Sequence, residues 1–491
     1  MYIDYSHFLN MVPEVSLLVI LVAVFVADFI TANKSYRGWF NTFVCGMLLL
    51  HTVLTIGDDT DVTLFEGMFV VTPTIGVIKS ILAFGTLLVC LQAKGWIASR
   101  ALTRYEGEFY LLVLSTLLGM NVMISANHFL LFFLGLEMAS VPMACLVAYD
   151  KWSKESAEAG AKFILTATFS SGVMIYGLSL LYGSVGNLFF CDFAHSVSAT
   201  PLAIAGLVFF FSGLAFKLSL VPFHFWTADT YQGAPTPVTG YLSVISKGAA
   251  AFALFTILTK VFAGMFEYWH VMLCIVTVLS ITIANLFAIR QRNIKRFMAF
   301  SSISQAGYIM LALLSVGDLG SSVSALIYYV LIYIVANLAI FAIISLVETK
   351  TGGCVNINDY NGLYKTNPNL SFIMTLALFS LGGIPPFAGM FSKFFVFMAA
   401  VKGYTIDTTV GLLTYAVVFI ALVNTVVSLY YYLLIVKAMY IKTNDNPVKV
   451  IATDVNTKLT LALCTLGVAV FGVLSVVYTW IYASTVNTCL F

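Results

Sequence analysis

Five lysines lie inside long apolar stretches of this sequence, apart from the polar segments that hold the other basic residues. An ammonium group in hydrocarbon is costly unless it is paired, hydrated or neutralised, so intramembrane lysines usually mark a path for ions or protons. A buried lysine can lose its proton, whereas arginine effectively cannot. Interior lysines without an interior arginine therefore favour proton handling over charge anchoring. The five are Lys79, Lys162, Lys217, Lys247 and Lys393.

Two of these lysines lie beside prolines that interrupt a helix. In LAFKLSLVPFHFW, Pro222 follows Lys217 by five residues, and in SLGGIPPFAGMFSK a Pro-Pro pair precedes Lys393. Proline removes a backbone donor and clashes with the preceding turn, so each stretch predicts a broken helix whose freed carbonyls need a polar or hydrated partner. The one carboxylate near the middle of an apolar stretch is Glu137.

The composition indicates a polytopic helical membrane protein. Of the 491 residues, 60% are hydrophobic and only 9% are charged, and apolar runs extend along nearly the whole length. The eight cysteines are scattered singly, without a C-x-x-C pair, so we expect no metal site and no iron–sulfur cluster on this chain. The net charge is only +2, and the charged residues lie mostly in short loops. We therefore expect a lipid bilayer around the chain and no nucleic-acid partner.

Assigning about 20 residues to each span predicts about 14 transmembrane helices and an all-α fold. Broken helices at corresponding places in two halves are the usual sign of inverted repeats around a transport site. Because spans 7 and 12 are the interrupted ones, spans 4–8 and 9–13 are predicted to be two five-helix repeats of opposite topology. The predicted units are helices 1–3 in 1–106, the first repeat in 107–269, the second repeat in 270–440 and helix 14 in 441–491. The predicted spans are 11–33, 38–56, 73–93, 107–125, 127–149, 156–182, 201–226, 238–261, 270–289, 297–316, 323–347, 371–401, 409–440 and 459–484.

Basic residues mark one side of these spans. Seventeen of the 24 Lys and Arg residues lie in loops that follow odd-numbered spans, and the opposite loops hold only Lys260 and Lys402. The positive-inside rule then predicts that the basic loops are cytoplasmic and that both termini are on the periplasmic side. We expect the inner membrane of a bacterial cell, with the mitochondrial inner membrane as the alternative.

Five stretches resemble one family of membrane subunits. They are FKLSLVPFHFWTADTYQGAPTPVTGYLSVISK (216–247), LGLEMASVP (134–142), EAGAKFIL (158–165), NIKRFMAFSSISQAGY (293–308) and GGIPPFAGMFSKFFVF (382–397). Together they closely resemble the antiporter-like N subunits of proton-translocating NADH:quinone oxidoreductase (respiratory complex I), called subunit 2 in mitochondria, and the resemblance covers essentially the whole chain. One departure is Gln305, where many relatives have histidine. A water-mediated link is expected to suffice there.

The resemblance implies a proton relay. In the family a carboxylate of the fifth span pairs with a lysine of the seventh, and protons move through lysines of the eighth and twelfth. In this sequence these residues are Glu137, Lys217, Lys247 and Lys393.

Three further positions carry weaker expectations. Lys162 is a candidate modulator of the carboxylate–lysine pair. His224, just after Pro222, either lines the proton entrance or satisfies the helix break. Lys79, about two turns past Pro73, is expected to extend its ammonium toward the membrane surface.

The resemblance also implies the setting. The chain would move protons beside other membrane subunits of the complex, while FMN, iron–sulfur clusters and quinone are expected on partner subunits, because this sequence has no dinucleotide fingerprint, flavin motif or cluster ligands. One alternative is a subunit of a multisubunit cation/proton antiporter, and another is a scaffold whose polar residues only brace the bundle. The YQGAPTPVT loop favours a subunit of NADH:quinone oxidoreductase over the antiporter. The excess of interior lysines over carboxylates disfavours a scaffold.

Overall fold

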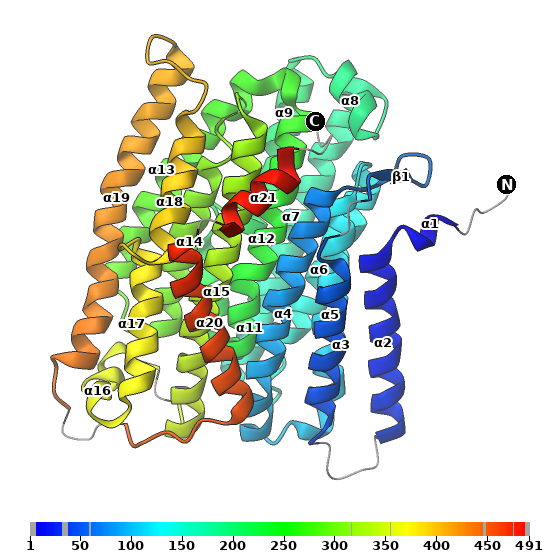
Figure 1. The fold of residues 1–491 in the computed structure, drawn as a ribbon. Coiled ribbons are helices and arrows are strands. Elements are labelled where there is room, and N and C mark those ends of the chain that lie inside the picture. Colours follow the sequence, from blue (N-terminus) through cyan, green and yellow to red (C-terminus); the bar gives the residue numbers. More distant parts are fainter. Residues whose placement is uncertain are drawn as a thin grey trace.

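The computed structural model describes residues 6–31, 38–57, 60–315, 317–353, 355–444, 448–474 and 476–486. Figure 1 shows a bundle of helices that run between two faces, with α2 (Val12–Thr31) at one edge, α19 (Thr409–Tyr440) at the opposite edge and α15 (Leu319–Thr351) between them. In the described residues, 11 helical segments are long and apolar enough to cross a membrane. With α3 (Phe40–Thr55), α14 (Ile294–Leu311) and the interrupted pair α17–α18 they correspond to the predicted spans. The all-α polytopic fold is confirmed.

The remaining elements follow in chain order. They are α1 (Ser6–Leu9), β1 (Val62–Leu64), β2 (Phe69–Val71), α4 (Pro73–Ser99), α5 (Glu106–Ser125), α6 (Phe129–Val147), α7 (Lys154–Val185), α8 (Phe190–Ser196), α9 (Pro201–Leu218), α10 (Phe225–Gly233), α11 (Thr236–Tyr241), α12 (Lys247–Thr256), α13 (Phe266–Ile289), α16 (Leu363–Thr366), α17 (Pro368–Gly382), α18 (Ala388–Val401), α20 (Val455–Val473) and α21 (Val476–Val486).

The centre of the bundle is α15, which is buried continuously over residues 321–347. Its sequence is apolar on all sides, as expected for a helix that other helices surround. Helix α14 is also buried along its length but carries Ser, Gln and Tyr side chains. Those polar groups lie inside the protein and need partners there.

Both predicted helix breaks are present. Helix α9 ends at Leu218, Ser219 adopts the left-handed conformation with φ 62°, and α10 begins at Phe225. Helix α17 ends at Gly382, Gly383 has φ 84°, and α18 begins at Ala388. The eighth span contains π-helical turns at residues 242–246 and 257–261, on either side of α12. Such turns often occur at functional sites, and the first one ends immediately before Lys247.

Close contact between α5 and α6 fixes the position of the fifth span. A Cβ atom at Gly119 would lie 2.4 Å from the backbone nitrogen of Ala139, and one at Gly135 would lie 2.5 Å from that of Met123. Only glycine allows the two backbones to approach this closely. Glu137 lies on the same part of α6.

Two features differ from the sequence-based expectations. The last predicted span is not one helix, because Leu474 is extended between α20 and α21. Near this point α20 crosses the second helix break, where a Cβ atom at Gly472 would lie 2.5 Å from the carbonyl oxygen of Pro386. The loop before α4 contains an unpredicted antiparallel hairpin, β1–β2, in which Val62 pairs with Val71.

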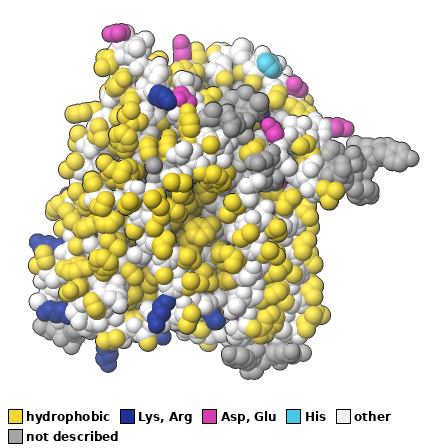
Figure 2. Space-filling view, in the orientation of Figure 1, with side chains coloured by type: hydrophobic (Ala, Val, Ile, Leu, Met, Phe, Trp, Pro, Cys, Tyr) yellow, Lys and Arg dark blue, Asp and Glu magenta, His cyan; other side chains and the backbone are white. Residues whose placement is uncertain are grey.

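Charge is distributed unequally between the two ends of the bundle. In Figure 2 most visible Lys and Arg side chains lie at the lower end, most Asp and Glu side chains lie at the upper end, and apolar side chains cover the region between them. The hairpin and α8 are at the upper end in Figure 1. Lys34 and Arg37 of the predicted basic side, and both chain termini, lie outside the described residues.

Candidate proton-transfer site

Three of the predicted lysines are buried in the interior of the bundle. Lys217, Lys247 and Lys393 have exposed fractions of 6%, 1% and 4%. They belong to α9, α12 and α18. In the described part of the chain, no ion pair within 4.0 Å joins any of the three to a carboxylate. Their partners are hydroxyl, carbonyl and aromatic groups.

Glu137 and Lys217 are linked indirectly. The Lys217 ammonium donates a hydrogen bond to Ser140 Oγ at 2.6 Å, and Ser171 Oγ donates to Glu137 Oε1 at 2.5 Å. Ser140 follows Glu137 by three residues, so the two lie on the same side of α6. The carboxylate and the ammonium still interact electrostatically. Each of the two charged groups thus bonds a different serine, and the direct pairing that the resemblance implies is not formed in this structure.

A small cavity adjoins this pair of contacts. Its volume is about 10 Å³, and Ser140, Ser170, Ser171 and Lys217 contribute to its lining. That volume is at the lower limit for one water molecule. A single water or a rotation of the serine hydroxyls would be enough to connect the carboxylate side to the ammonium.

Lys247 contacts the polar side of α14. Its ammonium donates to Ser302 Oγ at 2.7 Å and lies 5.6 Å from the centre of the Tyr231 ring. The Tyr231 hydroxyl is 3.3 Å from the same Ser302 oxygen. Ser302 also reaches the carbonyl of Ser243, whose hydroxyl accepts a hydrogen bond from Asn337 Nδ2 at 2.7 Å. Lys247 is thus the start of a buried hydrogen-bonded network.

Gln305 forms a second group of buried hydrogen bonds one turn further along α14. Its side-chain oxygen accepts a hydrogen bond from the Tyr329 hydroxyl. Its side-chain nitrogen donates to the Leu381 carbonyl and to the Tyr432 hydroxyl, each at 3.2 Å. These direct hydrogen bonds reach neither Lys247 nor Lys393, so a water-mediated link at this position stays a prediction. One of them ends on α17, immediately before the second helix break.

Lys393 lies at that break. Its ammonium donates to the carbonyl of Gly382, the last residue of α17, at 3.3 Å. It also lies 4.7 Å from the centre of the Tyr308 ring. The ammonium thus satisfies a carbonyl that the interrupted helix leaves free. Ser302, Gln305 and Tyr308 recur at three-residue intervals, so one side of α14 extends from the Lys247 site to the Lys393 site.

Lys162 does not join this network. Its side chain is 44% exposed and forms ion pairs with Glu158 at 2.7 Å and with Asp229 at 2.8 Å. Asp229 also pairs with Arg296 at 2.9 Å. The expectation of a buried lysine is wrong, because Lys162 is only two turns from the start of α7, where carboxylates of two helices can reach it. Its role as a modulator stays a prediction.

His224 lies in the first helix break, directly before α10. It is 7% exposed, and its Nδ1 atom has no hydrogen-bond partner among the described residues. The ring is close enough to Lys247 to interact with it electrostatically. His224 is therefore buried beside the relay, and its part in proton entry stays a prediction.

Lys79 is also buried, with an exposed fraction of 1%. Its ammonium is 2.5 Å from Glu14 Oε1. The expectation that it extends to the membrane surface is wrong, because α2 supplies a carboxylate inside the protein.

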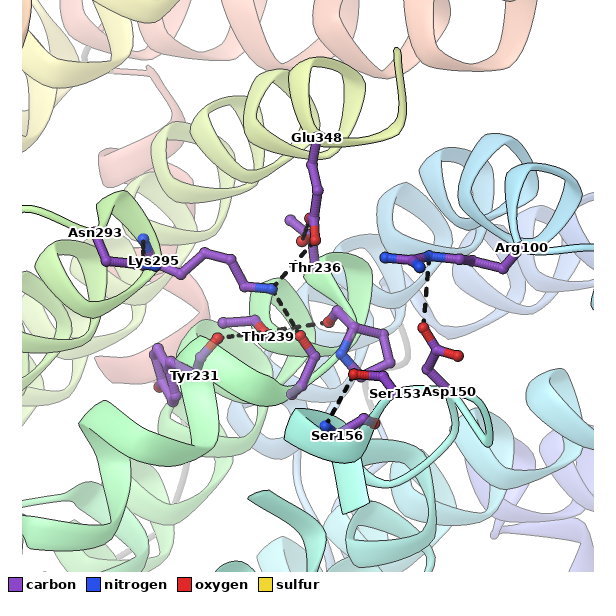
Figure 3. Close-up of polar contacts among 12 residues, drawn as sticks. Arg100, Asp150, Ser153, Ser156, Tyr231, Thr236, Thr239, Asn293, Lys295 and Glu348 are labelled. Atoms are coloured by element: carbon purple, nitrogen blue, oxygen red, sulfur yellow. Dashed lines mark hydrogen bonds and ion pairs between the residues drawn. The ribbon is translucent and has the colours of Figure 1, made fainter. Parts of the chain in front are cut away.

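A further buried pair fixes the loop between α10 and α11. Figure 3 shows Lys295 of α14 and Thr236 of α11 converging on Glu348 of α15. Lys295 Nζ is 3.7 Å from Glu348 Oε1 and donates to the Ala234 carbonyl at 2.9 Å. The Thr236 hydroxyl donates to the other carboxylate oxygen. These contacts hold the chain between Tyr231 and Lys247.

Sequence reasoning missed several residues of the network. Tyr431 and Tyr432 look like membrane-facing aromatics in the sequence, yet both are 0% exposed. Ser302, Tyr329 and Asn337 gave no signal, because hydroxyls and single amides are common in helices. Ser302 lies three residues before Gln305 on α14, and this spacing is the one pattern that could have indicated it. Tyr329 and Asn337 lie on α15.

Comparisons with known proteins agree with this architecture. The family model described as "NADH:quinone oxidoreductase/Mrp antiporter, TM" matches residues 126–420. The chain is 57% identical to NADH-quinone oxidoreductase subunit N of Phocaeicola vulgatus, over 97% of this chain and 98% of that protein. It is 47% identical to the protein of the same name from Azobacteroides pseudotrichonymphae, over 97% and 98%.

Solved structures give the same result. A chain of respiratory complex I from Thermus thermophilus with bound aureothin matches with a TM-score of 0.75 and 28% identity, over 94% of this chain and 96% of that chain. A chain of the Mrp complex from Dietzia sp. DQ12-45-1b shares the fold, with a TM-score of 0.83 and 20% identity over 98% of each chain. The extent and identity of these matches show that the chain belongs to the family of NADH-quinone oxidoreductase N subunits, the antiporter-like membrane subunits of complex I.

Proposed function

We propose that this chain translocates protons through Glu137, Lys217, Lys247 and Lys393, within a NADH-quinone oxidoreductase whose redox chemistry occurs on other subunits. The observation that carries the proposal is that three buried lysines donate to hydroxyl and carbonyl groups instead of carboxylates. A direct ion pair would hold the proton on the lysine, whereas neutral partners leave both release and uptake open.

In this relay Glu137 controls the charge on Lys217 through their electrostatic interaction. When the carboxylate is protonated or moves away, the ammonium loses its electrostatic partner and releases a proton more readily. His224, in the break between α9 and α10, is the proposed group for proton entry. From Lys247 the hydroxyl and amide groups of α14 lead toward Lys393, where a proton is exchanged with the next site.

The setting proposed for the relay follows the family. Spans 4–8 and 9–13 act as two inverted five-helix repeats around the two helix breaks, and the lysine-rich face is cytoplasmic, with both termini on the periplasmic side of a bacterial inner membrane. The partners are other membrane subunits of the complex. FMN, iron–sulfur clusters and quinone are bound by partner subunits, and no cofactor is assigned to this chain.

The second candidate is a subunit of a cation/proton antiporter. The family model that matches residues 126–420 supports it, because its description names both NADH:quinone oxidoreductase and the Mrp antiporter. The N-subunit relatives are far more similar in sequence and favour the first function. Sodium dependence separates the two, since only an antiporter requires a counter-transported cation.

The test uses the intact complex reconstituted in liposomes, with proton pumping followed by a pH-sensitive dye during NADH oxidation. Glu137→Gln should reduce coupled quinone reduction and pumping while assembly on native gels and NADH oxidation by a soluble acceptor are kept. Glu137→Asp should be milder, because the charge survives with a shorter reach. Glu155→Gln, at an exposed carboxylate of α7, is the matched control and should behave like the parent.

Normal pumping by assembled Glu137→Gln would show that the carboxylate is structural. Pumping that stops when sodium is removed would favour the antiporter.

A further inference from the structure

A second cluster of buried ionisable groups lies in the N-terminal helices, outside the proposed relay. Glu14 of α2, His51 of α3 and Lys79 of α4 have exposed fractions of 5%, 1% and 1%. The Lys79 ammonium is 2.5 Å from Glu14 Oε1. His51 Nδ1 is 2.8 Å from the hydroxyl of Ser16. Three helices thus bring a carboxyl group, an amino group and an imidazole into one interior site.

Two atoms of this site have no hydrogen-bond partner among the described residues. They are Glu14 Oε2 and His51 Nε2, and both are buried. Buried polar atoms without partners are rare because their desolvation is not compensated. A carboxylate oxygen and an imidazole nitrogen are also the two kinds of side-chain atom that take up a proton most readily near neutral pH or below it. The pattern therefore fits a site that accepts a proton.

The cluster lies close to the end of the bundle that carries the β-hairpin. Glu14 is in the first turn of α2. Lys79 is the seventh residue of α4, so it lies about 9 Å along the helix axis from the first residue of that helix. The ring of Phe69, in β2, is 5.2 Å from the Lys79 ammonium. Asp61, directly before β1, and Glu66, in the loop between the two strands, are exposed. The hairpin is thus the element that covers the site at this end of the bundle.

An apolar region separates the cluster from the lysine relay. Ile78 and Leu82 of α4, Phe252 of α12 and Val330 of α15 contribute to an apolar lining between Lys79 and the segment that starts at Lys247. The cavity there is only about 10 Å³ and has no polar groups to hold a water molecule. The N-terminal cluster is therefore a separate site and does not extend the relay.

A hydrogen-bonded connection nevertheless joins the hairpin to the eighth span. The backbone nitrogen of Asn127 donates to the Met68 carbonyl at 2.8 Å, and its side-chain nitrogen donates to the Gly67 carbonyl at 2.8 Å. The Asn127 side-chain oxygen accepts a hydrogen bond from Lys260 at 3.2 Å. Lys260 lies in the π-helical turn that closes the segment begun by Lys247.

We propose that Glu14, His51 and Lys79 bind one exchangeable proton from the aqueous phase at the hairpin end and thereby make coupled turnover depend on the pH of that compartment. The proton binds to His51 Nε2, in the same cluster as the Glu14–Lys79 ion pair, and no covalent bond to carbon is broken. Binding adds one positive charge beneath Phe69. The hairpin, Asn127 and Lys260 carry the effect to the eighth span. This inference rests on the proton translocation proposed above.

The test separates titration from structural bracing with two variants. His51→Asn keeps an amide in the place of Nδ1, where it can still bond Ser16, but it does not titrate. The double variant Glu14→Gln with Lys79→Met removes the ion pair without leaving a lone buried charge, so a purely structural pair should be replaced at little cost. Assembly on native gels and NADH oxidation by a soluble acceptor are checked for each variant.

The readout is the coupled rate of the reconstituted complex as the pH on the hairpin side is varied at fixed pH on the other side. For a single binding site the parent rate should change by up to about tenfold per pH unit within the titration range. In His51→Asn this dependence should be lost. In the double variant, which keeps His51, the dependence should shift to another pH range because the two charges near the imidazole are gone. Infrared difference spectra of the parent with labelled histidine, recorded across a pH step, should contain a protonation band that disappears in His51→Asn.

The proposal is overturned if assembled variants keep the pH dependence of the parent, or if the histidine band is unchanged in His51→Asn. Recovery of parental behaviour in the double variant would show that the ion pair only braces the helices. Lys247→Arg is tested in parallel and should lose pumping at every pH. Pumping by that variant would count against the relay, whatever the N-terminal variants show.

Discussion

Replacement of Lys247 by arginine distinguishes a proton carrier from a fixed positive charge. Lys247 is 1% exposed, donates to Ser302 at 2.7 Å and faces the Tyr231 ring. Arginine can keep the charge, the hydrogen bond and the contact with the ring. The property it lacks is release of the proton.

The size of the effect follows from the intrinsic acidities. The pKa of a free lysine side chain is about 10.4, and that of arginine lies roughly 2–3 units higher. Each unit corresponds to about 1.4 kcal/mol, so deprotonation of arginine costs about 3–5 kcal/mol more and proton transfer slows about 10²–10³-fold. Coupled turnover should fall to the residual level of Lys247→Ala.

The bulk of arginine is the main competing explanation, because overpacking a buried site costs about 1–3 kcal/mol. Native gels and NADH oxidation by a soluble acceptor monitor that effect. Lys154→Arg is the matched control, since it makes the same exchange at an exposed lysine at the start of α7. It should pump like the parent. If assembled Lys247→Arg also pumps like the parent while Lys247→Ala does not, the position supplies a fixed charge and the relay is wrong.

Three further perturbations test other parts of the structure. Ser171→Ala removes the hydroxyl that donates to Glu137. A hydrogen bond to a charged group is worth about 1.5–3 kcal/mol, so pumping should fall about tenfold or more. Unchanged pumping would mean that the serine does not position the carboxylate. Gln305→Leu leaves buried hydrogen-bond partners unsatisfied at about 1–3 kcal/mol each, so native gels should show less assembled complex than for Gln305→His. Equal assembly of the two variants would mean that the hydrogen bonds of Gln305 do not stabilise the protein. Burial raises the pKa of Asp318, but hydrogen bonds from Lys402 and a serine outweigh it, so that the pKa lies below its usual range. Stabilisation by this pair is therefore present above about pH 4 and lost as the pH falls further, and the melting temperature of the parent should approach that of Asp318→Asn in acid; a constant difference would refute the argument.

The sequence by itself determined the class of the protein, the number of spans and the places where two of them break. These are local properties, because the length of an apolar run decides whether a helix can cross the bilayer and proline interrupts a helix wherever it occurs. The burial of Lys217, Lys247 and Lys393 followed for the same reason, since each lies well inside an apolar run.

The tertiary structure decided which groups these side chains meet. Lys162 was expected inside the membrane but pairs with Glu158 and Asp229, and Lys79 was expected at the surface but pairs with Glu14. A helix that is apolar on all sides has no periodic signal to show which side faces protein and which faces lipid. Partners from helices distant in the sequence are set only when the bundle packs, and with them whether a lysine is held by a carboxylate or left free to exchange its proton.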